Sequence, residues 1–399
     1  MPWTDLSPMD QRLELVTLAR SGEFTVTELA LRFGVSKKTA HKWISRFEVG
    51  GAAALEDQSP APKCSPQKTP DDVERLIVKL KRAHPTWGPK KIRVLLERDH
   101  GVGSPPATST IGEILKRHGL VRKRRRRAGV YPRPNEGLTE AERPNHVWAV
   151  DHKGWFLLGD GNKCIPLTVS DLHSRYLIAL EADTDATQRS ARKGFEKAFC
   201  RHGLPEIIRV DNGSPFASMG PGRLSKLSVW WIGQGIEVEF TRPGNPQDNG
   251  AHERMHRTLK DECCAPASAH RAAQQQRFNR WKKSFNEVRP HESLAQRVPA
   301  DFYHPSNRRL DGTTSARLYE PGDETLPVSR SGSISLGGKA FHVGEALAGT
   351  RVLIERSKGG VISVRYANVK LGEYREDQKY RFLMPPGHYE LGKRIHGRK

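Results

Sequence analysis

No stretch of the 399-residue chain approaches the ~20 consecutive apolar residues that a membrane-spanning helix requires. The N-terminus also lacks the charged and then apolar pattern of a secretion signal. Cysteine is scarce, and no two cysteines form a C-x-x-C pair: Cys64, Cys164, Cys200, Cys263 and Cys264. These absences predict a cytoplasmic protein without a membrane partner, in which the cysteines are reduced thiols and no zinc ribbon is present.

The chain has fewer acidic than basic residues. It contains 45 Asp and Glu and 66 Lys and Arg, which give a formal net charge of +21. The basic excess extends from residue 12 to residue 399 and is not confined to one tail. Such a charge favours a polyanionic partner, with nucleic acid as the default. A ribosomal or membrane-surface protein would share this charge. The length is sufficient for two to four domains.

The N-terminal part of the chain has a helical pattern. Residues 8–47 are predicted to form two or three short helices, with Gly34 in the turn before the last one. A helix, a glycine turn and a helix that opens with Ser and basic residues are typical of a helix-turn-helix, whose second helix enters the major groove. A plain helical hairpin with a solvated basic face is the alternative. We therefore predict a DNA-binding domain at residues 1–50, with contacts from Ser36, Lys37, Lys38, Thr39, His41 and Lys42.

Three acidic residues stand at the ends of predicted elements in the second half of the chain. The apolar run 147–151 ends in Asp151, and the run 206–210 is followed by Asp211. The intervening strands and helices predict a mixed sheet flanked by helices, in which the two Asp residues lie side by side. Glu253 follows on a helix for which Asp248 or Asn249 is the expected cap. Each residue alone is more simply a turn or surface residue, but three converging carboxylates require a divalent cation to coexist.

The helix of Glu253 carries Arg257 and Lys260 on the same face, at positions i+4 and i+7. A carboxylate beside two basic side chains suits a surface that holds a cation and then a phosphodiester. The alternative is that Arg257 merely pairs with Glu253, which would contribute only ~0.3 to 0.5 kcal/mol on an exposed surface. We predict that both basic residues contact DNA.

The segment His252-Glu253-Arg254-Met255-His256 also matches H-E-x-x-H, in which two His bind zinc and Glu is the general base of a peptidase. The Gly and His of the extended motif are absent, since Leu259 and Glu262 occupy those positions. A peptidase would also leave the net charge and the two Asp residues unexplained. A DNA-binding regulator without catalysis is a third class, and mutation of the carboxylates would separate the three.

A group of short segments resembles one known family, the integrase-type D,D,E transposases of bacterial insertion sequences. The resemblance covers roughly residues 25–372, since the flanking domains are also similar to that family. One departure is a longer interval between the second and third carboxylates, with the excess at residues 218–228. The segments that carry the resemblance are Asp151, Asp211-Asn212-Gly213-Ser214, Asp248-Asn249-Gly250-Ala251-His252-Glu253 and Arg257-Thr258-Leu259-Lys260.

The resemblance implies a multidomain protein with a ribonuclease-H-like, retroviral-integrase-like α/β catalytic core, which we place at residues 144–305. It implies metal-dependent DNA strand cleavage and strand transfer at Asp151, Asp211 and Glu253. We expect two Mg²⁺ ions, with Mn²⁺ as a substitute, about 3.5 to 4 Å apart. The implied partners are double-stranded DNA, as the terminal inverted repeats of the element and the target, and further copies of the chain in a homo-oligomer. The implied location is the bacterial nucleoid.

Changes in composition indicate a linker and two further modules in the rest of the chain. Residues 51–70 are rich in Ala, Pro, Ser and Gln and are expected to be a linker. Residues 71–121 predict a basic three-helix module, which the resemblance makes winged-helix-like. Short strands separated by Gly recur after residue 305 and predict a small all-β SH3-like barrel at 325–375, suited to DNA binding or to self-association.

Residues 122–127 form an unbroken basic run. Such runs are usually disordered and solvated, and a nuclear-localisation signal is the usual interpretation. This one lies between DNA-binding modules and a nuclease-like core. We therefore expect residues 122–143 to be a basic linker that follows DNA phosphates, with contacts from Arg124, Arg125 and Arg126.

Overall fold

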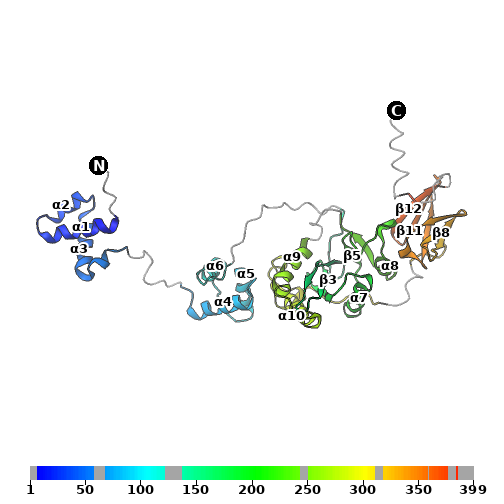
Figure 1. Cartoon of the computed structure of the whole chain (residues 1–399), viewed down its shortest axis with the longest axis horizontal. Helices are drawn as coiled ribbons and strands as arrows, with labels where there is room; N and C mark the ends of the chain where they lie inside the picture. Colours follow the sequence, from blue (N-terminus) through cyan, green and yellow to red (C-terminus); the bar gives the residue numbers. More distant parts are fainter. Residues whose placement is uncertain are drawn as a thin grey trace, which may run out of the picture. The chain divides into compact units, whose positions relative to one another are not determined.

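The computed structural model divides the chain into two units, Met1–Thr69 and Pro70–Lys399 (Figure 1). No helix among the described residues is long and apolar enough to cross a membrane. The predicted DNA contacts of Arg124, Arg125 and Arg126 and the predicted cap at Asp248 or Asn249 lie outside the described residues. The structure describes residues 7–57, 68–121, 137–242, 250–310, 318–357, 359–375 and 383–384.

The N-terminal unit is helical, as predicted. The turn before its third helix contains Gly34 at φ 63°, a left-handed conformation that favours glycine. Ser36 then caps that helix by accepting a hydrogen bond from the backbone N–H of Thr39. Trp43 and Leu55 are buried between the helices. The elements are α1 (Pro8–Ser21), α2 (Val26–Arg32), α3 (Lys37–Gly50) and a 3-10 turn (Ala52–Leu55).

Three helices form the next module: α4 (Asp71–Ala83), α5 (Pro89–Arg98) and α6 (Thr108–Arg117). Residues 68–121 contain no strand, so the helical part of the prediction is observed there and a wing is not. Val288 of the following domain packs against the apolar core of this module. Arg98 donates to the carbonyl of Val288 at 3.0 Å, and Lys90 pairs with Glu292. The module is therefore docked on the domain that follows.

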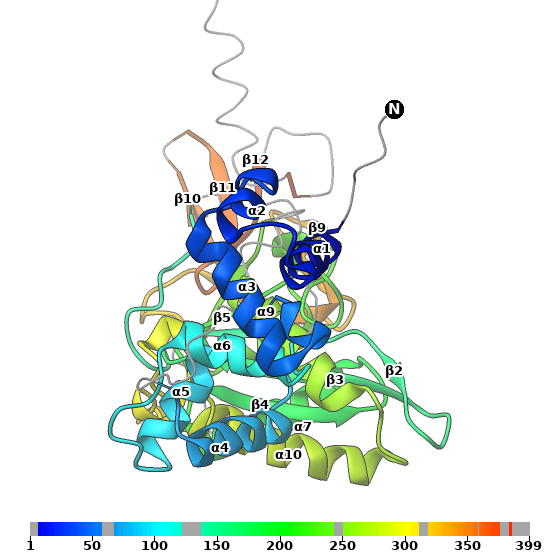
Figure 2. The ribbon, with the colours of Figure 1, turned by 90° about the vertical axis from the view of Figure 1, so that its left-hand side faces the viewer.

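A mixed sheet forms the centre of the second unit, with strand order β2-β3-β1-β5-β6 and β4 paired to β3. The pairs of β3 with β1, β2 and β4 are antiparallel, whereas β5 is parallel to β1 and to β6. The hairpin that carries β2 projects from the sheet (Figure 2). The predicted meander followed by helical crossovers is thus confirmed. The strands are β1 (Val147–His152), β2 (Phe156–Leu157), β3 (Lys163–Asp171), β4 (Leu177–Asp183), β5 (Ile207–Val210) and β6 (Glu237–Phe240).

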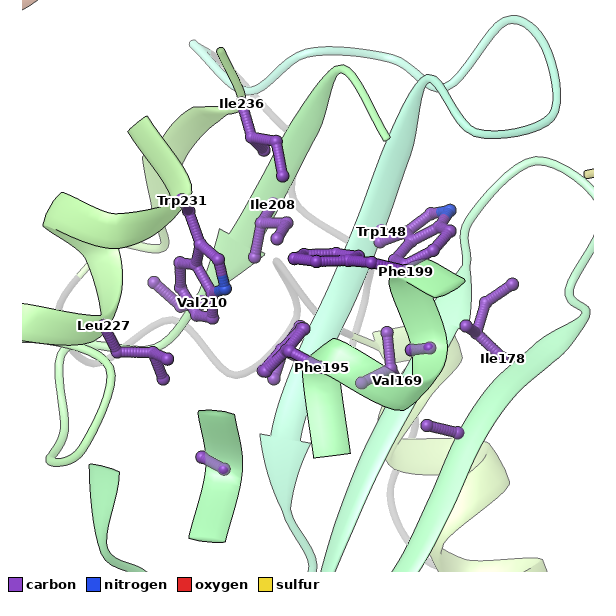
Figure 3. Close-up of a cluster of buried hydrophobic side chains, with 14 of the residues drawn as sticks. Trp148, Val169, Ile178, Phe195, Phe199, Ile208, Val210, Leu227, Trp231 and Ile236 are labelled. Carbon is purple, nitrogen blue, oxygen red and sulfur yellow. The ribbon is translucent and has the colours of Figure 1, made fainter. Parts of the chain in front are cut away.

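Helices cover both faces of this sheet, α7 (Gln188–His202) and α8 (Lys226–Gly233) on one and α9 (Gly250–Leu259) and α10 (Arg271–Glu287) on the other. Figure 3 shows the first face, where Phe199 of α7 packs on Trp148 and Trp231 of α8 packs on Phe195 in the same buried cluster. Side chains along a strand alternate between faces. Since Trp148 and Val150 of β1 face α7 and α8, the next residue, Asp151, faces α9.

The C-terminal module is all-β, as predicted. Its strands pair as an antiparallel sheet, β12-β11-β10-β7, and a separate hairpin, β8-β9. Phe341 of the hairpin and Val364 and Tyr374 of the sheet share one buried core. The SH3-like barrel remains a prediction. The strands are β7 (Thr325–Pro327), β8 (Ser333–Leu336), β9 (Lys339–His342), β10 (Arg351–Arg356), β11 (Val361–Tyr366) and β12 (Val369–Arg375).

The additional residues between the second and third carboxylates have a structural role. Residues 218–228 contain a tight turn, in which Gly222 has φ 65°. A Cβ atom there would lie 2.9 Å from Cγ1 of Val369 in β12. Leu224 and Val229 enter the core of the all-β module. Residues 218–228 therefore contribute, together with Val229 of α8, to the surface on which the C-terminal module docks.

Candidate active site

Two of the three predicted carboxylates lie at the same edge of the sheet. β1 and β5 are parallel, with Val147 opposite Ile207. Asp151 is four residues beyond Val147, and Asp211 is four residues beyond Ile207. The register therefore places the two Asp residues side by side, where neighbouring strands are about 4.8 Å apart. The side chain of Asp151 is 30% exposed, whereas Asp211 is exposed and accepts a hydrogen bond from the backbone of Gly213.

Glu253 lies in the first turn of α9 and is exposed. Burial and the negative charge of Asp211 raise the pKa of Asp151 to about 7, and Glu253 adds a smaller contribution of the same sign. Among the described residues, no group of three His, Cys, Asp or Glu side chains is placed to hold a metal ion. The structure therefore brings Asp151 and Asp211 together and places Glu253 nearby, without a complete three-carboxylate site.

A buried network of hydroxyls and imidazoles connects α9 to the sheet. The hydroxyl of Thr168 donates to the main-chain oxygen of Asp151 at 2.8 Å. Its oxygen then accepts from Nε2 of His252 and from Nε2 of His256, each at 2.7 Å. The hydroxyl of Ser170 lies 2.7 Å from Nδ1 of His252 and donates to it. Because the Thr168 proton is donated to Asp151, both imidazoles carry a proton on Nε2.

This network determines where α9 lies relative to Asp151. Thr168 is opposite Asp151 in the β1–β3 register and is completely buried. Nδ1 of His256 lies 3.5 Å from Oδ2 of Asp151. Burial lowers the pKa of His252 to about 3 and that of His256 to about 2. The two histidines thus fix the helix that carries Glu253 against the strand that carries Asp151.

The same contacts remove the basis for a zinc peptidase. That alternative needs one free nitrogen on each His and Glu253 beside the metal. Both nitrogens of His252 bind hydroxyl groups, and its side chain is only 1% exposed. The i, i+4 spacing of the histidines therefore serves to pack α9 on β3. Sequence reasoning missed this role, for which the alternating Thr168 and Ser170 of β3 are the only local signal.

The raised pKa of Asp151 predicts a pH-dependent stability. The folded chain favours the protonated carboxyl, so this contribution is complete below the ordinary value of 3.8 and is lost as pH rises through about 7. Asp151→Asn removes the charge. In EDTA above pH 7 the variant should be more stable than the parent by about 1 to 2 kcal/mol, a figure reduced for the partial exposure of the side chain. Denaturant unfolding at a series of pH values measures the difference.

Mg²⁺ provides a second measurement on the same pair of proteins. A ligand that binds only the folded state raises its stability. Mg²⁺ should therefore raise the melting temperature of the parent above pH 7 and leave that of Asp151→Asn unchanged. Asp160→Asn, in the exposed turn between β2 and β3, is the matched control. Equal stability of the parent and Asp151→Asn at every pH would contradict the prediction.

The predicted DNA-contacting residues in the described part of the chain occupy accessible positions. Lys37, Lys38, His41 and Lys42 are exposed on α3. Ser36 and Thr39 instead hydrogen-bond to each other in the N-cap, with 2.9 Å between their hydroxyls. Arg257 and Lys260 are exposed and form no ion pair among the described residues, so the pairing of Arg257 with Glu253 is not observed. α9 ends at Leu259, and Lys260 begins a π-helical segment, Lys260–Cys264.

Comparison with known proteins agrees with this architecture. The sequence matches an integrase core domain over residues 141–246 and a second integrase core domain family over residues 234–299. Residues 11–63 match a helix-turn-helix domain, and residues 39–115 match a homeodomain-like domain. The chain is therefore similar to integrases and transposases in its core and to helix-turn-helix proteins in its N-terminal part. Its helix-turn-helix domains imply that it binds DNA.

Relatives of this chain include proteins of bacterial insertion sequences. It is 27% identical over 235 residues to a 31.7 kDa protein of insertion element IS407 from Burkholderia multivorans, which covers 57% of this chain and 78% of that protein. It is 25% identical over 218 residues to the transposase of IS904 from Lactococcus lactis, with coverage of 51% and 83%.

Solved structures with some similarity are viral integrases. The HTLV-2 integrase catalytic core domain in complex with magnesium is 16% identical and gives a TM-score of 0.34, with coverage of 41% of this chain and 100% of that one. The simian T-cell lymphotropic virus intasome is 15% identical, with a TM-score of 0.37 and coverage of 76% and 100%.

Proposed function

We propose that this protein is a DNA transposase that binds the ends of its mobile element and catalyses metal-dependent strand cleavage and strand transfer. The observation that carries the proposal is that Asp151 and Asp211 follow neighbouring parallel strands at equivalent positions of the register, with Glu253 on the helix that packs on this sheet. Burial, and then the negative charges of Asp211 and Glu253, raise the pKa of Asp151, and a bound divalent cation would offset these negative charges.

We assign Asp151, Asp211 and Glu253 as the metal ligands, with two Mg²⁺ ions or Mn²⁺ in their place. The bound cations would activate a water molecule or a DNA 3′-hydroxyl as the nucleophile and stabilise the leaving oxygen. Glu253 is exposed on α9 and adds to the negative charge at Asp151. His256 and Thr168 hold α9 against the strand that carries Asp151. The chemistry needs no covalent link between protein and DNA.

The decisive experiment is a strand-joining assay with the full-length chain, Mg²⁺ and DNA that carries the ends of the element. The ends are found by a search for short inverted repeats in the DNA that flanks the gene. We expect cleaved and joined products in Mg²⁺ or Mn²⁺, none in EDTA, and no detergent-resistant protein–DNA adduct. A chain that binds the ends and never cleaves or joins them would be a regulator and would contradict the proposal.

Lys260 gives a separate prediction about DNA binding. Its side chain is exposed, has no ion pair among the described residues, and comes directly after the end of α9. Lys260→Ala should weaken binding of DNA ends and reduce the salt dependence of log K by about one unit, with little change in melting temperature. Lys283→Ala, on the exposed side of α10, is the control. A lower melting temperature with unchanged DNA affinity would make Lys260 a structural residue.

A further inference from the structure

A cavity of about 300 Å³ lies beside α9 on a face that does not carry Glu253. Its lining from α9 is Ala251, Arg254, Met255 and Thr258, which share one side of the helix at positions i, i+3, i+4 and i+7. The remaining walls come from α5, the turn after β3, the end of α10 and the segment that follows α10. The second helical module and the sheet domain therefore build this cavity together.

The charged lining of the cavity is mainly basic. Lys91, Arg175, Arg254 and Arg289 contribute four positive groups, against the acidic Asp171 and Glu292. Glu292 already pairs with Lys90 outside the cavity. Asp171 accepts hydrogen bonds from the backbone N–H groups of Asn145 and Ser174 and from the hydroxyl of Ser174. Asp171 still raises the pKa of Arg175, and Glu292 that of Lys91, but each by less than the neighbouring arginine lowers it.

Three of the four basic side chains have no hydrogen-bonded or ion-paired anionic partner among the described residues. Arg289 pairs with Glu262 at 2.7 Å. The side chains of Lys91, Arg175 and Arg254 form no hydrogen bond or ion pair in the described part of the chain. Lys91 and Arg175 are half-buried, and charged groups that are withdrawn from water normally find a partner. Their shared cavity thus has the charge of an anion site.

Mutual repulsion among these cations is visible in their pKa values. Burial and then the charge of Arg289 lower the pKa of Lys91 to about 8. Burial and then the charge of Arg254 lower the pKa of Arg175. Arg175 also has φ 64°, a left-handed conformation that is unfavourable for a residue with a side chain. The turn thus keeps an arginine in an unfavourable backbone conformation beside like charges. A bound anion would relieve the repulsion between these charges.

We propose that this cavity binds a backbone phosphate of the DNA on which the protein acts. Guanidinium groups form paired hydrogen bonds with phosphate oxygens, and Arg175 and Arg254 supply two of them from separate elements. Lys91 adds a positive charge from the second helical module. One phosphate would therefore connect that module, the sheet and α9. The identity of the anion as DNA rests on the proposed function, whereas the anion site itself rests on the lining residues.

DNA affinity at several salt concentrations tests the proposal. Fluorescence anisotropy would use the full-length chain, a short mixed-sequence duplex and no divalent cation, so that the DNA stays intact. Arg175→Gln with Arg254→Gln should weaken binding about tenfold or more and reduce the salt slope by about 0.9 for one lost phosphate contact. Arg280→Gln with Arg330→Gln removes two charges at exposed positions outside the cavity and should change affinity less than about twofold.

Inorganic phosphate gives a second, DNA-independent measurement. It should raise the melting temperature of the parent and of the control variant, and this response should be absent from the cavity variant. Arg254 is exposed, so Arg254→Gln alone serves if the double variant folds poorly. Circular dichroism verifies the folding of each protein.

Three results would overturn the inference. Unchanged DNA affinity and salt slope in the cavity variant would exclude a DNA phosphate as the bound anion. If the response to inorganic phosphate were lost in the same variant, the cavity would be a site for free anions only. A loss of self-association with intact DNA binding would assign the cavity to a carboxylate of another copy. An equal loss of DNA affinity in the control variant would show that the effect comes from the total charge of the protein and not from the cavity. By contrast, cavity-dependent DNA binding without strand joining in Mg²⁺ would contradict the proposed function alone.

Discussion

Asp151→Asn, Asp211→Asn and Glu253→Gln are each expected to reduce strand cleavage and joining at least about a thousandfold, equivalent to roughly 4 kcal/mol of transition-state stabilisation. Each change removes one negative ligand from a site that must hold divalent cations and preserves the shape of the side chain. Binding of the DNA ends should remain close to that of the parent, because the basic residues are unchanged. Strand-joining gels and anisotropy measure the two properties separately.

A matched control distinguishes a site effect from a general effect of lost charge. Asp160 is exposed in the turn between β2 and β3, and Asp160→Asn should retain the activity of the parent. Strand joining at the parental rate in any one of the three carboxylate variants would remove that residue from the site. Loss of activity with loss of folding in Asp151→Asn would also contradict the greater stability expected for that variant in EDTA.

Removal of residues 1–57 is expected to abolish the protection of specific end sequences and to leave weaker, salt-sensitive binding to any DNA. These residues belong to a separate compact unit, so the rest of the chain should fold without them. Specific binding commonly exceeds nonspecific binding by at least about a thousandfold, and a loss of this size is expected. Footprints on the inverted repeats and affinities for unrelated DNA measure the change.

Point variants separate DNA contact from folding of this unit. Lys37→Ala with Lys42→Ala removes two exposed charges from α3 and should weaken end binding without a change in the melting temperature. Arg20→Ala, at an exposed position of α1, is the control and should bind the ends as the parent does. An unchanged footprint after deletion of residues 1–57 would assign recognition of the ends to another module.

Several elements follow from the sequence because their signals are local. Gly34 and Ser36 lie next to each other at the turn and cap of α3, and the structure has both in those roles. Apolar runs and turn residues predict β1 and β5 to within a residue or two. The order of strands and helical crossovers then places Asp151 beside Asp211, since parallel neighbours in one sheet end at the same edge.

Other features depend on residues that are distant in sequence. Thr168 and His252 are 84 positions apart and meet only because β3 and α9 pack on the same face. The sequence pattern of the two histidines fits zinc binding equally well, and only the buried hydroxyls of β3 decide between the two. In the same way, the cavity collects Lys91, Arg175 and Arg254 from three separate elements.

The division between the two kinds of information has a physical reason. Helix caps, turns and strand alternation are determined by backbone preferences over a few residues, so the sequence by itself determined the order and type of most elements and the edge of the sheet at which two carboxylates meet. Side-chain partners across layers depend on how those elements pack. Only the tertiary structure therefore decided that the histidines of α9 bind Thr168 and Ser170, that residues 218–228 support the C-terminal module, and that unpaired cations share one cavity.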